Sequence, residues 1–189
     1  DHVGQVAAAL EKHTGAHVRH TSATTSLSHI GGKIEVRART PLRTRQDMTM
    51  AYTPGVGRVA TAIAARPESA WTLTAKGTSV AIVTNGTAVL GLGDIGPLGA
   101  LPVMEGKSLI FKEFAGLNAY PLCMNARTPQ AVIDATLAIA PGFGGINLED
   151  IAAPDCFQVE TELQRQLDVP VFHDDQHGTA VVVSAALLN

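Results

Sequence analysis

The sequence predicts an α/β fold: a mostly parallel sheet flanked by helices, with a small α+β remnant at the N-terminus. From Pro41 onward, short apolar runs typical of strands alternate with longer amphipathic stretches typical of helices. Hydrophobic residues make up 46% of the 189 residues and charged residues 16%, which gives the chain enough apolar surface to bury a core. No internal repeat or low-complexity linker interrupts the alternation.

The remnant comes first along the chain. Residues 4–13 carry apolar side chains at helical spacing, and Gly15 ends this predicted helix. Residues 17–27 and 33–38 alternate polar and apolar side chains, so we expect a strand in each. Because one helix and two strands of this length cannot bury a core alone, we expect them to be the last part of a larger module.

The elements of the α/β domain follow in order. We expect strands at 78–85, 119–124, 144–148 and 169–172. We expect helices at 57–66, 106–117, 128–142, 156–167 and 178–189. The third of these helices has clear boundaries, with Thr128 as N-cap, Pro129 in the first turn and Gly142 after the end.

Charge and composition exclude several classes of partner. A net charge of -3 and a pI near 6.2 leave no excess of cations to neutralise phosphates, so we expect no nucleic acid. The longest apolar runs are too short to span a bilayer, so we expect no membrane partner. Cys123 and Cys156 form no metal-binding pattern and fit a reducing, cytoplasmic location. Because the chain starts at Asp1 without a methionine, the absence of a signal peptide carries little weight.

Residues 91–96, GLGDIG, have the spacing of a dinucleotide-binding turn. In such a turn the third glycine opens a helix, and an acid follows about twenty residues later at a strand end. Here Gly99 is a poor helix former, Asp94 has the wrong charge to face a pyrophosphate, and the acid falls inside a helical pattern. We favour a tight turn that lets the backbone approach a small substrate. Such a turn would also direct the residues that follow it, Glu105, Gly106 and Lys107, toward that substrate.

Two pairs of adjacent acids come directly after buried strands. Glu149 and Asp150 follow one strand, and Asp174 and Asp175 follow another. Ligands of open α/β sheets collect at the carboxyl ends of strands, so the pairs are expected to meet there. Oxygen ligands without cysteine suit Mg2+ or Mn2+. The alternative is that the acids cap helices, but four converging negative charges need a cation.

Four other side chains are candidates for chemistry. His173 and His177 have a spacing that zinc sites also use, but they lack a third ligand of zinc type, so we expect a structural role. Tyr52, beside a rigid Pro-Gly turn, is either a fixed proton donor or a packed aromatic residue. Lys107 is either a solvated cation or a general base whose pKa a nearby metal lowers.

Five motifs, in this order and spacing, resemble those of bacterial malic enzymes: YTPGV, VLGLGDIG, PVMEGK, NLEDI and VFHDDQHGTA. The likeness runs from about residue 33 to the end of the chain. It implies oxidative decarboxylation of L-malate to pyruvate and CO2, with NAD+ or NADP+ accepting the hydride. It also implies that the GLGDIG stretch belongs to the substrate domain and is not the nucleotide fingerprint.

The resemblance assigns roles to single residues. Lys107 matches the general base that removes the C2 hydroxyl proton, and Tyr52 matches the general acid that protonates C3 of enolpyruvate. Asp174 matches an acid beside the metal that positions a neighbour. The ligands of Mg2+ or Mn2+ correspond to Glu149, Asp150 and Asp175. The arginine that holds a malate carboxylate in larger members is absent, and Lys76 is a candidate replacement.

The resemblance also implies three parts. Residues 1–38 resemble part of an ACT-type regulatory module, residues 39–172 the substrate domain, and residues 173–189 the start of the NAD(P)-binding domain. The chain is thus expected to be a fragment that cannot complete the redox reaction alone. Two alternatives stay open: a malolactic-type enzyme, or a catalytically incomplete module that binds metal and dicarboxylate. A homodimer or larger homo-oligomer is expected, with Tyr52 and Lys107 meeting in one chain or across an interface.

Overall fold

A computed structural model describes residues 2–18 and 24–189 of the chain. The chain divides into two compact units, Asp1–Gly32 and Lys33–Asn189, and each is described by itself. Among the described residues, no helix is long and apolar enough to cross a membrane.

The first unit contains helices and no strand in its described part. Helix α1 spans His2–Thr14 and ends before Gly15 at φ 68, which confirms the predicted helix. The strand predicted at 17–27 is wrong where it can be compared, because Thr24–Leu27 form helix α2, while residues 19–23 lie outside the described part. The strand predicted at 33–38 is also wrong. An alternating pattern forms a strand only beside another strand, and the described residues offer these segments none.

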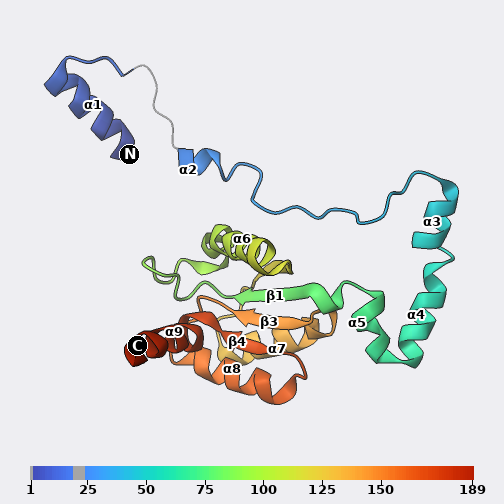
Figure 1. Cartoon of the computed structure of the whole chain (residues 1–189). Coiled ribbons are helices and arrows are strands. Elements are labelled where there is room, and N and C mark those ends of the chain that lie inside the picture. Colours follow the sequence, from blue (N-terminus) through green and yellow to red (C-terminus); the bar gives the residue numbers. More distant parts are fainter. Residues whose placement is uncertain (1, 19–23) are drawn as a thin grey trace. The chain divides into compact units, whose positions relative to one another are not determined.

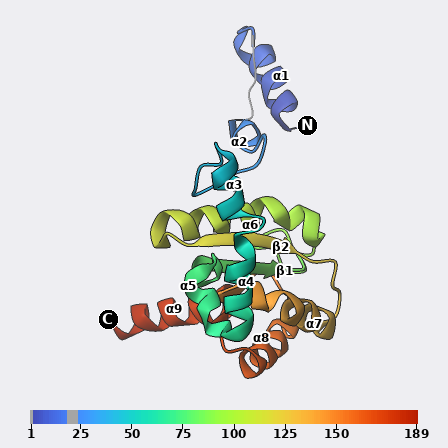
Figure 2. The same cartoon turned by 90° about the vertical axis from the view of Figure 1, so that its right-hand side faces the viewer.

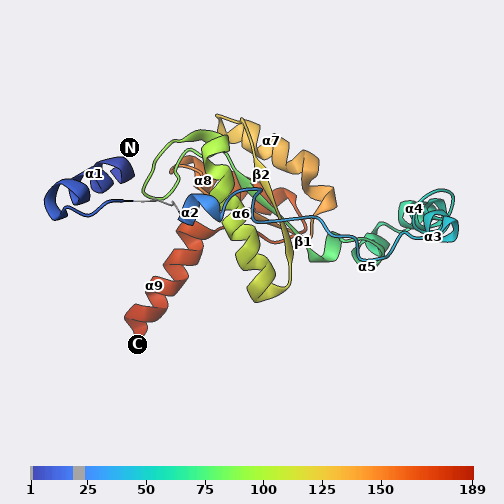
Figure 3. The same cartoon turned by 90° about the horizontal axis from the view of Figure 1, so that it is seen from above.

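The second unit alternates helices and strands, as predicted. Three helices and two 3₁₀ turns lead into the sheet: α3 Arg45–Ala51, α4 Val56–Ala65, η1 Pro67–Ser69, α5 Ala70–Leu73 and η2 Lys76–Thr78. The sheet region follows: β1 Ser79–Thr84, α6 Gly96–Ala115, β2 Asn118–Cys123, α7 Pro129–Ile139, η3 Ala140–Gly142, β3 Gly145–Leu148, α8 Asp155–Gln166, β4 Val171–His173, the π-helical turn η4 Asp174–Gly178, and α9 Thr179–Leu188. Figure 3 shows α9 extending away from the sheet.

The strands form one parallel sheet in the order β2-β1-β3-β4 (Figure 1). Val83 pairs with Leu148, and Leu148 pairs with His173, so the carboxyl ends of β1, β3 and β4 lie side by side. This register confirms the predicted parallel sheet. It brings the segments after β3 and β4 to the same edge.

Helices cover both faces of the sheet. Figure 2 shows α6 on one side and α7 and α8 on the other. Ile82 of β1 packs with Met104 of α6 in one core, and Val83 belongs to the opposite core with α7 and α8. Strand β1 is therefore buried on both faces, as expected for a central parallel strand. Helix α8 confirms the helix predicted at 156–167, and its residues Cys156, Val159 and Leu163 are buried in this second core.

Helix α6 starts ten residues earlier than the prediction, at Gly96 instead of 106. Pro97 stands in its first turn, where the missing N–H costs nothing. Gly99 fits because a Cβ there would come within 3.0 Å of the Ile95 side chain. The weak helix propensity of glycine is thus overridden by close packing, and Lys107 falls in the middle of the helix.

Candidate active site

The end of β3 positions Glu149 and Asp150. The Glu149 N–H donates to the Val83 carbonyl at 2.9 Å, which extends the pairing of β3 with β1 by one residue. Asp150 then takes a left-handed conformation at φ 54, an arrangement that costs about 1–3 kcal/mol in a residue with a Cβ. The turn points the Asp150 N–H at Oδ2 of Asp175, 3.2 Å away. Both acids are nearly completely buried.

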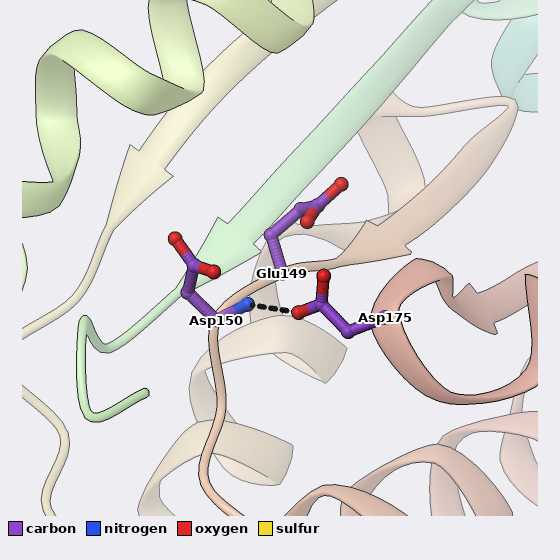
Figure 4. A group of neighbouring side chains, drawn as sticks. All are labelled: Glu149, Asp150 and Asp175. Carbon is purple, nitrogen blue, oxygen red and sulfur yellow. Dashed lines mark hydrogen bonds between the residues drawn. The ribbon is translucent and has the colours of Figure 1, made fainter. Parts of the chain in front are cut away.

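Asp175 completes a group of three carboxylates (Figure 4). One oxygen each from Glu149, Asp150 and Asp175 lies within 4.8 Å of the others. Asp175 is exposed and comes from η4, whereas the other two are buried beside the end of β3. Oδ2 of Asp150 receives no hydrogen bond from any residue that the structure describes. A buried carboxylate oxygen without a donor fits a cation, and the all-oxygen set suits Mg2+ or Mn2+.

Lys107 reaches the same group from α6. Its Nζ lies 2.5 Å from Oε1 of Glu149 and 2.5 Å from Oδ2 of Asp174. The three residues come from α6, the end of β3 and η4, so the contact ties one helix to two loops. The ammonium neutralises part of the negative charge that the four acids bring together.

The pKa values reflect this balance. Burial raises the pKa of Glu149 to about 7, although the Lys107 ammonium lowers it in part. Burial and then the Asp175 charge raise the pKa of Asp150 to about 6. For Lys107, burial disfavours the charged form, but hydrogen bonds to Asp174 and Glu149 outweigh it and the pKa is raised. The site therefore titrates near neutrality, where a cation and protons compete for the same oxygens.

Glu160 of α8 contacts two histidines, His173 directly before η4 and His177 within it. Oε1 of Glu160 accepts a hydrogen bond from the His173 N–H at 3.0 Å, and Oε2 lies 2.5 Å from Nδ1 of His177. The ring of His173 is buried, and burial lowers its pKa. Sequence reasoning missed Glu160. The signal was available, because this acid stands on the buried stripe of α8, four residues after Cys156 and three before Leu163.

Tyr52 is a predicted site residue that the structure does not bring to the group. It caps α3 and is 66% exposed. Within the described part of the chain, no hydrogen bond joins its side chain to another residue of the site. The segment α3–α5 leads into the amino-terminal end of β1, whereas the carboxylates lie at the carboxyl ends of the strands.

The glycines of residues 91–96 shape a loop before α6. Gly91, Gly93 and Gly96 have φ of 76°, 76° and 73°, which side chains with a Cβ rarely adopt. The first of them comes seven residues after β1 ends at Thr84, instead of directly at the strand end as in a dinucleotide turn. The Gly86 carbonyl accepts hydrogen bonds from Ile95 and Gly96 and folds the loop onto the strand end.

Lys76 is engaged away from the carboxylates. Its Nζ donates to the carbonyls of Pro141 and Phe143 and lies 4.9 Å from the centre of the Trp71 ring. These contacts fix the turn before β1 and leave Lys76 no part in the acidic group.

Residues 31–132 match the family model described as malic enzyme, N-terminal domain. The chain belongs to the malic enzyme family. Its GLGDIG loop and Lys107 lie inside the matched range, and the three carboxylates follow it.

Similar malic enzymes cover the rest of the chain. The NAD-dependent malic enzyme of Geobacillus stearothermophilus is 58% identical over 181 residues, which are 96% of this chain and 38% of that protein. The bifunctional malic/malolactic enzyme of Bacillus subtilis is 48% identical over 84% of this chain and 38% of its own length. The crystal structure of the NAD-dependent malic enzyme of Thermotoga maritima superposes with a TM-score of 0.85 at 47% identity, over 89% of this chain and 48% of that one. The chain thus spans less than half the length of these relatives.

Proposed function

We propose that the protein containing this chain converts L-malate to pyruvate and CO2, with NAD+ or NADP+ accepting the hydride. This chain supplies the half of the active site that binds substrate and metal. The observation that carries the proposal is the ammonium of Lys107 placed against a buried carboxylate of a three-acid oxygen cluster. The membership of the malic enzyme family and the names of its relatives support it.

Glu149, Asp150 and Asp175 are the proposed ligands of Mg2+ or Mn2+. Such an ion polarises the C2 oxygen of malate and stabilises the negative charge that loss of CO2 leaves on the substrate. Because the pKa of Glu149 is raised to about 7 and that of Asp150 to about 6, protons compete with the cation for these oxygens near neutral pH.

Lys107 is the proposed general base for the C2 hydroxyl. A lysine acts as a base only when its amine is neutral, and in this chain two carboxylates favour the charged form. Binding of a cation by Glu149 would remove part of that stabilisation and would lower the pKa of Lys107. Asp174 then remains the contact that orients the amine, which suits its proposed positioning role.

Tyr52 is the proposed acid for C3, and we propose that it comes from a second copy of the chain. The exposed phenol has exposed apolar neighbours on the same segment, at Met48, Met50 and Val56. Apolar residues gathered on one exposed segment are typical of protein interfaces. A homodimer in which each α3–α4 segment reaches the other subunit's carboxylates completes both active sites.

Location and regulation also stay proposals. We propose a cytoplasmic enzyme, which suits the two unpaired thiols of Cys123 and Cys156. A regulatory role for residues 1–38, as the remainder of an ACT-type module, and the domain boundaries after 38 and 172 stay predictions.

A malolactic activity is the second candidate, because one relative carries both activities in its name. Product analysis of the full-length protein with malate, Mn2+ and each nicotinamide cofactor separates the possibilities. Equal amounts of pyruvate, CO2 and reduced cofactor support the proposed reaction, and lactate without net reduction supports the malolactic one. Binding of Mn2+ and malate without turnover, seen by calorimetry, would mean a binding module instead.

A further inference from the structure

The turn η4 carries two of the five clustered site residues in only five positions. Asp174 contacts Lys107, and Asp175 accepts from the Asp150 N–H and offers an oxygen to the proposed metal. The backbone of η4 is closed by the Thr179 N–H, which donates to the Asp174 carbonyl, and contacts from neighbouring elements at both ends add to this single turn. The position of both acids therefore depends on contacts outside the turn.

Glu160 makes such contacts at both ends of η4. Its Oε1 accepts from the backbone N–H of His173, which directly precedes the turn, at 3.0 Å. Its Oε2 lies 2.5 Å from Nδ1 of His177, the fourth residue of the turn. Asp174 and Asp175 lie between these two anchor points.

The carboxylate of Glu160 is itself fixed. Glu160 is 2% exposed and stands on α8 between the core residues Val159 and Leu163. The Gln164 side chain donates to Oε1 at 3.4 Å and to the Val171 carbonyl of β4 at 2.8 Å. An acid on a buried helix face is costly unless it is well paired, and two of its three partners belong to the ends of η4.

We propose that Glu160 is a positioning residue that holds Asp174 and Asp175 in place by fixing both ends of η4. The inference rests on the proposed metal site, since it concerns how one ligand of that site is oriented. Residues that orient metal ligands typically affect metal affinity or activity by about 10- to 100-fold. Loss of Glu160 is expected to weaken metal binding within this range, although Glu160 touches no proposed ligand side chain.

The test measures Mn2+ affinity of the full-length protein by electron paramagnetic resonance, without substrate, at a temperature where thermal unfolding shows each variant to be folded. Glu160→Ala removes both contacts and is expected to raise the Mn2+ dissociation constant by about 10- to 100-fold. Glu160→Gln keeps an acceptor for the His173 N–H, so its Mn2+ affinity is expected to fall by less than that of Glu160→Ala. Glu162→Gln is the matched control, because Glu162 lies on the same helix and pairs with the exposed Arg165.

A double-mutant cycle with His177 tests whether Glu160 acts through its contact with this residue. His177→Asn should weaken Mn2+ binding, and combining it with Glu160→Gln should add less than the sum of the two single effects, because both changes break one contact. A folded Glu160→Ala or Glu160→Gln variant with the affinity of the Glu162→Gln control overturns the inference. If Glu160→Ala does not fold, the Mn2+ affinity of Glu160→Gln relative to the Glu162→Gln control decides whether the inference holds. Failure of the unaltered protein to bind Mn2+ would instead overturn the proposed metal site and the inference with it.

Discussion

Nζ of Lys107 lies 2.5 Å from Oε1 of Glu149, so the proposed base and a proposed metal ligand share one ion pair. The pair links the two functions of the site: whatever binds Glu149 changes the charge balance around Lys107. We therefore expect the proposed proton transfer and the proposed metal binding to be coupled, and each can be tested by changing one partner alone.

Replacing Lys107 separates catalysis from metal binding. In the full-length protein, Lys107→Ala should lower kcat for malate oxidation by about 10²- to 10⁴-fold, the range for loss of a general base. Mn2+ binding should persist with an affinity no weaker than that of the unaltered protein, because Lys107 supplies no ligand atom and its ammonium no longer pairs with Glu149. Lys112→Ala is the control, since Lys112 lies on the same helix and contacts only Asn118 by its side chain, within the described residues. Near-normal turnover in Lys107→Ala would refute the assignment of the base.

Mixed subunits test where Tyr52 acts. A chain with Tyr52→Phe and a chain with Lys107→Ala should each be inactive in malate oxidation. If the phenol serves a second copy, coexpression produces mixed dimers in which one of the two sites has both groups intact. Random pairing then restores about a quarter of normal activity, measured as kcat per dimer. Activity no higher than that of the single variants would show that Tyr52 acts within its own chain or has no catalytic role.

The pH dependence of stability follows from the raised carboxyl pKa values. Glu149 and Asp150 titrate at about 7 and about 6 when folded, above their ordinary values of 4.5 and 3.8. Between these limits the folded state binds more protons than the unfolded state, so the free energy of unfolding falls as the pH rises. The stabilising effect of these two groups is complete below about pH 4 and lost above about pH 7.

Mn2+ should restore the stability that the folded protein loses as the pH rises. Because protons compete for the same oxygens, Mn2+ should raise Tm more at about pH 7.5 than at about pH 5.5. Thermal scans of the chelator-treated protein with and without Mn2+ measure the difference. The variant Glu149→Gln/Asp150→Asn serves as control and should show neither the pH trend nor the Mn2+ shift. An equal Mn2+ shift at both pH values would contradict the role of these carboxylates.

Gly86 tests the loop before α6. It has φ 67, and a Cβ there would lie 2.3 Å from the Gly96 carbonyl oxygen, so Gly86→Ala combines strain with a backbone clash. The loss should be at least about 1–3 kcal/mol in the free energy of unfolding, measured with urea. Gly57→Ala is the matched control in α4, where a Cβ meets no atom within 4 Å. It should be neutral or stabilise the protein by up to about 1 kcal/mol. Equal stability of the two variants would mean that the loop adapts freely.

The sequence predicts the parallel sheet well because its strands are buried on one or both faces and read as short apolar runs. The carboxylates could be predicted too, since Glu149 and Asp174 follow such runs directly. The start of α6 could not, because Gly99 and Pro102 disfavour a helix locally and the packing of Gly99 on Ile95 is visible only in three dimensions. The contact between Glu160 and His177 spans seventeen residues and two elements, so no local spacing reveals it.

Lys107 also has a consequence for how the protein matures. A cluster of buried acids without a cationic partner would either repel itself or hold its protons as the chain folds. The Lys107 ammonium lies against two of these acids, so part of their negative charge is neutralised without a metal ion. In the proposed enzyme, metal binding at Glu149 would replace one positive charge beside this carboxylate by another and would release the amine from that ion pair.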